Sequence, residues 1–179
     1  MGYKFFFVFK HAFFLVLLFL VINATGQGYF KEIPVIDLGF FKGNVPKNAA
    51  FASMTYIDYD YDFQIQSNKQ STEVKVKVNI SPNGARSYLD RKRVKEANID
   101  QLVEHEQGHV IIGFIIGKQV EEALNASRYT RNYKQEINAN YKKFYARFEK
   151  LQLRYDEETN HGANREAQAR WNREVLSKH

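Results

Sequence analysis

The residues best placed to do chemistry are two histidines and a glutamate in the segment His105-Glu106-Gln107-Gly108-His109. Histidines four residues apart on a helix project from one face, so their imidazoles can hold one metal ion between them. Glu106 lies beside them, where its carboxylate can take a proton from a metal-bound water. The pattern predicts a zinc ion (Zn²⁺) bound by His105 and His109, with Glu106 as the catalytic base. The alternative is a pair of hydrogen-bonded core histidines.

A catalytic zinc ion needs a third protein ligand, and the chain offers one further histidine inside the predicted domain. Of the five histidines, His11 falls in the N-terminal apolar segment and His179 is the last residue. His161 remains, in the polar segment 155–162, which we predict to be a loop that returns over the metal helix. His161 is therefore the predicted third ligand. Carboxylates are the alternatives, and Glu136, Glu157 and Glu158 are less constrained by their position than Glu121 and Glu122.

Residues near His161 suggest supporting roles. Tyr155 is a candidate donor to an oxyanion formed in catalysis, and an ordinary packed tyrosine is an equal alternative. Asp156 is a candidate to orient a ligand imidazole from behind, or else to cap a helix. Gln168 and Trp171 are predicted to serve packing and loop support.

The metal residues fall on a predicted helix from Asn98 to about Lys118. Val110 to Ile116 is apolar nearly all round, which is typical of a buried helix. A buried histidine or glutamate without a partner is costly, so polar residues on this helix need a reason. Two further helices are predicted at 131–153 and 164–176.

The segments before the metal helix show the alternation of β-strands. In 51–65, Thr55 and every second residue to Ile65 share one face, and 74–80 alternates in the same way. These segments are predicted to pair as an antiparallel hairpin, and 33–36 to form a short strand. Strands come first and helices later, so the class is α+β. We expect a small N-terminal strand pair, whose free edge could hold an extended peptide, packed on a helical part with a buried metal helix.

The first 26 residues have the layout of a secretory signal peptide. Lys4 and Lys10 precede the apolar run Ala12 to Ile22, and small residues follow at Ala24 and beyond. We therefore expect a signal peptide over 1–26, a single domain over 27–179, and a secreted or periplasmic protein. Contact with a membrane is expected only through an uncleaved signal segment.

Composition narrows the classes of partner and ligand. Cysteine is absent, which excludes disulfides and thiolate metal ligands. The net charge is +6, but the basic residues are spread along the chain, which favours a solvated surface over nucleic-acid binding. No nucleic-acid partner is expected.

Several of these segments together carry a family resemblance. They are Asp37 to Pro46 (DLGFFKGNVP), Ser87-Tyr88, the HEQGH segment, and Tyr155-Asp156 followed by Thr159-Asn160-His161-Gly162, Gln168 and Trp171. On these residues the chain resembles the DUF922 family of predicted bacterial secreted zinc proteases. The resemblance implies His105, His109 and His161 as ligands and Glu106 as the catalytic residue. Tyr88 stands where the family usually has tryptophan, and Val110 where it usually has phenylalanine.

The function expected from these observations is that of a secreted zinc metallopeptidase with a peptide or protein substrate. A zinc amidase acting on cell-wall peptides would use the same residues. An exported, non-catalytic zinc-binding module is the third candidate. A closed site with four protein ligands would favour that module, whereas a catalytic zinc keeps one position open.

Overall fold

The computed structural model of the chain describes residues 33–67 and 72–178. The predicted signal peptide, residues 1–26, lies outside the described residues and stays a prediction. Within the described residues, no helix combines the length and the apolar character that a bilayer span requires.

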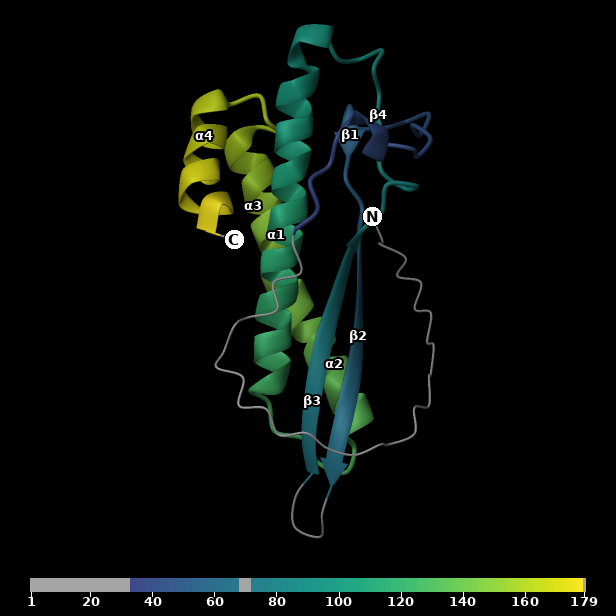
Figure 1. The fold of residues 1–179 in the computed structure, drawn as a ribbon, viewed down its shortest axis with the longest axis vertical. Coiled ribbons are helices and arrows are strands. Elements are labelled where there is room, and N and C mark those ends of the chain that lie inside the picture. The colour runs from purple at the N-terminus through teal and green to yellow at the C-terminus, as the bar shows by residue number, and fades with distance from the viewer. Residues whose placement is uncertain (1–32, 68–71, 179) are drawn as a thin grey trace, which may run out of the picture. The chain divides into compact units, whose positions relative to one another are not determined.

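The described chain is α+β, as the sequence predicted (Figure 1). Its strands are β1 (Ser53–Met54), β2 (Ile57–Ser67), β3 (Thr72–Pro82) and β4 (Tyr88–Leu89). Its helices are α1 (Ile99–Asn125), α2 (Tyr133–Phe148), α3 (Lys150–Thr159) and α4 (Arg165–Glu174). Short 3-10 turns cover Leu38–Phe40, Glu96–Asn98 and Leu176–Lys178.

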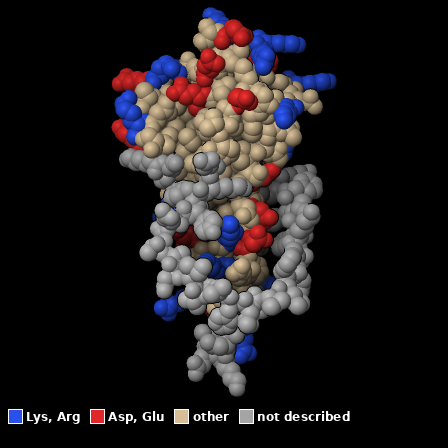
Figure 2. Space-filling view, viewed as in Figure 1, with Lys and Arg blue, Asp and Glu red and all other residues tan. Residues whose placement is uncertain are grey.

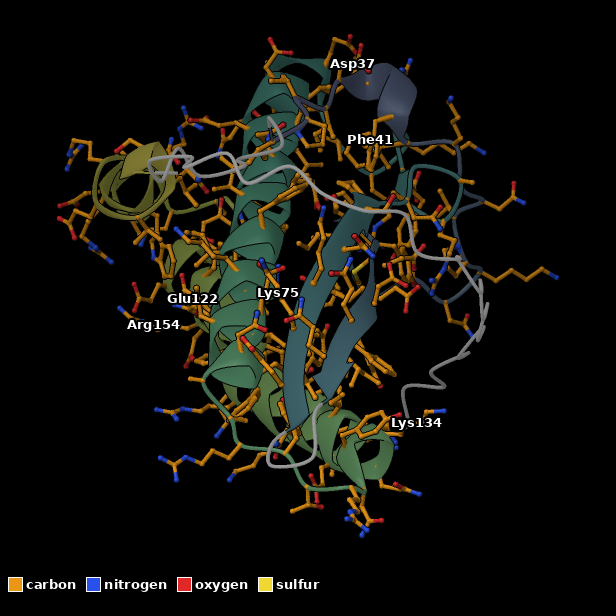
Figure 3. The ribbon with its side chains drawn as sticks, turned by 60° about the horizontal axis from the view of Figure 1, so that its bottom comes forward. Asp37, Phe41, Lys75, Glu122, Lys134 and Arg154 are labelled. Carbon is orange, nitrogen blue, oxygen red and sulfur yellow. The ribbon has the colours of Figure 1, made fainter. Side chains whose placement is uncertain are left out.

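Strands β2 and β3 form the predicted antiparallel hairpin, with Tyr61 opposite Val78. The alternation of the sequence is confirmed, because Val74, Val76 and Val78 are buried and the intervening residues of β3 are exposed. Figure 3 shows this hairpin beside α1, with Lys75 of β3 and Glu122 of α1 labelled.

The outer edge of β3 is closed by side chains from the C-terminal end of α1. Asn125 accepts a hydrogen bond from the Val76 N–H and donates one to the Val76 carbonyl, both at 2.8 Å. Glu121 accepts from the Val78 N–H at 2.8 Å. At this edge the Val76 N–H, the Val76 carbonyl and the Val78 N–H are therefore not free to pair with an extended peptide.

Helix α1 is the central element, and it contacts β3, α2 and α3. In Figure 1, α3 and α4 lie on one side of it and the hairpin on the other. The C-terminal half of α1 supplies much of the apolar core, because its side chains pack between the hairpin and α2. The buried members from α1 are Ile112, Ile116, Val120 and Leu124.

The predicted bounds were wrong in several places for identifiable reasons. Residues 33–36 form no strand, since the Ile36 N–H donates instead to Gln107 Oε1 at 2.7 Å. The predicted strand 51–65 is divided into β1 and β2, and the predicted helix 131–153 is divided at Glu149 into α2 and α3.

The predicted polar loop 155–162 is in its first half helical, because α3 continues to Thr159. Tyr155 and Thr159 are fully buried one turn apart, and the charged residues between them concealed that periodicity in the sequence. The metal helix also runs further than predicted, to Asn125 rather than Lys118.

Charged side chains of both signs occur on the face shown in Figure 2.

Candidate metal centre

A cluster of polar side chains lies against the N-terminal half of α1, and it draws on four elements. Helix α1 provides His105, Glu106 and His109, α3 provides Gln152 and Asp156, α4 provides Gln168, and β1 provides Ser53. Because His105, Glu106 and Gln168 are all nearly inaccessible to solvent, their polar atoms depend on partners within the protein.

The two histidines and Asp156 bring three potential ligand atoms together. The Nε2 atoms of His105 and His109 lie 3.2 Å apart. The Oδ1 atom of Asp156 lies 3.1 Å from the first and 3.0 Å from the second. These three residues form a group that could hold a metal ion.

A chain of hydrogen bonds fixes which nitrogen of His105 carries the proton. Asn172 Nδ2 donates to the Glu104 carboxylate at 2.7 Å, so Asn172 Oδ1 is left to accept from Gln168 Nε2 at 2.9 Å. Gln168 Oε1 then faces His105 Nδ1 at 3.1 Å. An amide oxygen can only accept, so Nδ1 of His105 donates and Nε2 of the neutral ring keeps its lone pair.

His109 is oriented in the same way by Gln152 from α3. Gln152 Nε2 donates to the backbone carbonyl of His109 at 3.0 Å, which is an acceptor only. Gln152 Oε1 therefore faces Nδ1 of His109, at 2.6 Å. Nδ1 donates, and Nε2 of the neutral ring again presents a lone pair toward His105 and Asp156.

Two imidazole lone pairs and one carboxylate oxygen thus converge, and this arrangement requires positive charge. Acceptor atoms this close repel unless a proton or a metal cation lies between them. Ligand atoms about 2.0 Å from a tetrahedral zinc ion would be about 3.3 Å apart, close to the observed separations. The donor set of two nitrogens and one oxygen also suits zinc. The residues present therefore fit the predicted ion.

The contacts between Asp156 and the two histidines also dominate the electrostatics of the site. Burial would raise the pKa of Asp156, but its interactions with the adjacent His105 and His109 outweigh burial and hold this pKa well below its usual range. Burial opposes a charge on His109, yet the hydrogen bond to Asp156 and the negative charges of Glu106 and Asp156 raise its pKa to about 9. In the metal-free protein a proton on His109 therefore supplies the positive charge near neutral pH.

Glu106 is buried beside the histidines and only one of its oxygens is satisfied. Its Oε1 accepts a hydrogen bond from the Ser53 hydroxyl at 2.5 Å. Its Oε2 is inaccessible to solvent and has no hydrogen-bond partner among the described residues. A buried carboxylate oxygen without a donor is costly, which marks Oε2 as an atom that awaits a partner from outside the protein.

Tyr155 is packed within the cluster. Its ring stacks on His105, with 4.7 Å between centroids, and its hydroxyl donates to the His105 carbonyl at 3.1 Å. Gln168 Nε2 donates to that hydroxyl at 2.7 Å. These are the contacts of the packed alternative, and a role of Tyr155 as an oxyanion donor stays a prediction.

Gly108 makes room for Tyr155. A Cβ atom at this position would lie 2.1 Å from the Tyr155 hydroxyl oxygen. The absence of a side chain at Gly108 therefore serves the packing of Tyr155 against α1.

His161 lies at the border of the cluster. Its Nδ1 is 3.3 Å from Asp156 Oδ1, its ring contacts that of Phe51 at a tilt of 37°, and its side chain is 46% exposed. The following residue, Gly162, has φ +81 and approaches His105 so closely that a Cβ would lie 2.9 Å from the His105 Cβ. His161 is outside the group His105, His109 and Asp156. Its assignment as third ligand stays a prediction.

Sequence reasoning missed Gln152 and Ser53 and assigned Gln168 only to packing. Gln152 had a detectable signal, because it precedes Tyr155, Asp156 and Thr159 at the spacing of one helix face. Asp156 was expected behind a ligand, whereas its Oδ1 lies among the ligand atoms. Ser53 had no signal, since a two-residue strand has no periodicity.

A family model described as "Bacterial protein of unknown function (DUF922)" matches residues 40–162, which include the α1 and α3 members of the cluster. No curated protein and no solved structure matches the chain.

Proposed function

The chain belongs to the DUF922 family, and we propose that it is a zinc-dependent hydrolase of peptide bonds in which Glu106 is the general base. The observation that carries the proposal is the convergence of two histidine lone pairs and the Asp156 carboxylate beside a buried carboxylate that keeps one free oxygen.

In this proposal each residue has a defined task. His105, His109 and Asp156 hold the ion, with His161 close enough to Asp156 to join them after a small movement. A bound zinc ion supplies a water of lowered pKa and polarises the substrate carbonyl. Glu106 would act as the base through Oε2, which would take up a proton and return it to the leaving nitrogen.

The test combines metal content with hydrolysis. Zinc is measured by mass spectrometry in the purified protein, and cleavage is measured on casein and on peptidoglycan peptides. Glu106→Gln keeps the shape of the side chain but removes the base. We expect it to retain zinc and to lose about 100- to 10,000-fold in kcat.

Glu122→Gln is the matched control, because Glu122 is an exposed glutamate on the same helix. We expect it to match the wild type. A zinc-loaded wild type that cleaves neither substrate, or a Glu106→Gln variant as active as the wild type, would contradict the proposal. Cleavage of peptidoglycan peptides but not casein would identify the amidase form of the same chemistry.

One observation favours a second candidate, an exported zinc-binding module without catalysis. The proximity of His161 to Asp156 means that four side chains could close around one ion. A closed site excludes small chelating inhibitors, whereas an open one admits them. Titrating the cobalt-substituted protein with a hydroxamate therefore separates the candidates, since binding to an open site changes the visible spectrum.

Export is part of the proposal. We propose that residues 1–26 direct secretion and are then removed, so that the substrate is a peptide or protein outside the cytoplasm. N-terminal sequencing of the protein recovered from the envelope or medium tests this, and an intact Met1 would contradict it.

A further inference from the structure

The hydrogen bond between Ser53 and Glu106 joins two buried groups 53 residues apart in the sequence. Ser53 is 7% exposed and Glu106 is 3% exposed. The Ser53 hydroxyl is the only hydrogen-bond donor to the Glu106 carboxylate among the described residues. With this bond in place, Oε1 is occupied and Oε2 is the oxygen left free.

The chain around Ser53 is fixed by the turn that follows β4. Arg93 donates to the carbonyls of Ala49 and Phe51 at 2.8 and 3.1 Å, and to that of Ala50 at 3.2 Å. The Asp90 N–H donates to the carbonyl of Ala52 at 2.7 Å. Four successive carbonyls are thus held, so Ser53 meets Glu106 from a rigid segment.

We propose that Ser53 is the positioning residue of Glu106, and that it fixes the carboxylate so that Oε2 is directed to the proton it accepts. The inference rests on the proposed function, because it concerns the orientation of the general base. A carboxylate held at one oxygen loses its rotation about the terminal side-chain bond, and small misplacements of a catalytic group cost large factors in rate.

A purely structural role for Ser53 predicts a different outcome. In that case removing the hydroxyl would lower stability, while each folded molecule would turn over substrate normally. Positioning instead predicts a lower kcat with an unchanged KM, since Ser53 acts on the base and not on substrate binding.

The first experiment measures kcat, KM and zinc content for Ser53→Ala and for Thr55→Val. Thr55 lies in the same segment, and its buried hydroxyl has no hydrogen-bond partner in the described structure, so it is the matched control. We expect Ser53→Ala to keep one zinc per chain, to lose about 10- to 100-fold in kcat and to keep KM within about twofold. Thr55→Val should match the wild type.

A second variant tests the positioning role in case Ser53→Ala folds poorly. Arg93 is exposed, and Arg93→Lys replaces the planar guanidinium, whose two terminal nitrogens donate to the three carbonyls, by a single ammonium nitrogen. We expect it to lower kcat by about 2- to 10-fold in the same direction, again without changing KM.

A readout without catalysis is the double-mutant cycle of Ser53→Ala and Glu106→Gln in metal-free protein, followed by urea unfolding. Contact between the two groups predicts that their effects on the unfolding constant are coupled by about tenfold or more. Additive effects, or an active wild type whose kcat survives Ser53→Ala within twofold, would overturn the positioning role alone. A zinc-loaded wild type without hydrolysis would overturn the proposed function, and this inference with it.

Discussion

The two halves of α1 bury side chains of different kinds, although they belong to one continuous helix. The N-terminal half buries His105 and Glu106, and side chains from β1, α3 and α4 contact all of their polar side-chain atoms except Oε2 of Glu106. The C-terminal half buries Ile112, Ile116 and Leu124 against the hairpin and α2. Directional contacts therefore dominate in the N-terminal half, whereas apolar packing dominates in the C-terminal half, beside the hydrogen bonds of Glu121 and Asn125 to β3.

This difference separates the candidate chemistry from the source of stability. Burying polar groups is at best modestly favourable even when each has a partner. Burying a leucine or isoleucine side chain contributes about 1.5–3 kcal/mol. The apolar half can therefore sustain the fold while the polar half is arranged for a ligand. Substitutions in the two halves should then change different measured quantities.

The largest effect is expected from His109→Ala in the polar half. Removing the His109 imidazole from the ligand set should weaken zinc binding by about 100- to 1,000-fold. In free energy this loss is roughly a quarter of the binding free energy of a typical structural zinc site. The far-UV circular dichroism spectrum should keep its helical form. Competition with a chromophoric chelator measures the affinity. Unchanged affinity would remove His109 from the ligand set.

The converse substitution is Leu124→Ala in the apolar half. Leu124 is 0% exposed, so the cavity and lost burial should lower the free energy of unfolding by about 2–5 kcal/mol. Urea unfolding measures this change, while the folded variant should still bind one zinc ion with wild-type affinity. A large loss of affinity would show that the halves of α1 are coupled.

The stability of the metal-free protein should depend on pH through His109, in the polar half of α1. The pKa of His109 in the folded protein is raised from its ordinary 6.5 to about 9. The contribution of His109 to the free energy of unfolding is therefore complete below about pH 6.5 and is lost as the pH rises toward 9. Stability should fall by at most about 3 kcal/mol over this window.

The measurement is urea unfolding in chelator-treated buffers from pH 6 to 9.5. Asp156→Asn removes the carboxylate whose hydrogen bond and charge help to raise this pKa, while Glu106 remains, so the stability of the variant should change less over the same window. A wild-type stability that rises between these values would contradict the assignment. Zinc affinity of the wild type should increase with pH here, because the proton on His109 competes with the ion.

The smallest effect is expected from Gln168→Leu. It removes the acceptor that holds Nδ1 of His105 and should weaken zinc binding by about 10- to 100-fold. Gln135→Leu, an exposed site on α2, is the control and should leave the affinity unchanged. An equal effect of both variants would show that the orientation of His105 does not depend on Gln168.

The same division explains what could be predicted from the sequence. The alternation of β2 and β3 and the spacing of His105 and His109 are local patterns, so the hairpin and the shared face of α1 followed from them. The contacts of Ser53 and Gln152 join residues 53 and 43 positions apart, and no local period reports such pairs. Asp156 was singled out, but its place among the ligand atoms depends on how α3 packs on α1.

The closed edge of β3 has a consequence for behaviour at high concentration. Exposed strand edges recruit strands from neighbouring molecules, which leads to aggregation. Asn125 and Glu121 bond three of the backbone groups through which such pairing could begin, namely the Val76 N–H, the Val76 carbonyl and the Val78 N–H. The C-terminal end of α1 thereby hinders β3, a long strand of alternating apolar and polar residues, from pairing with strands of neighbouring molecules.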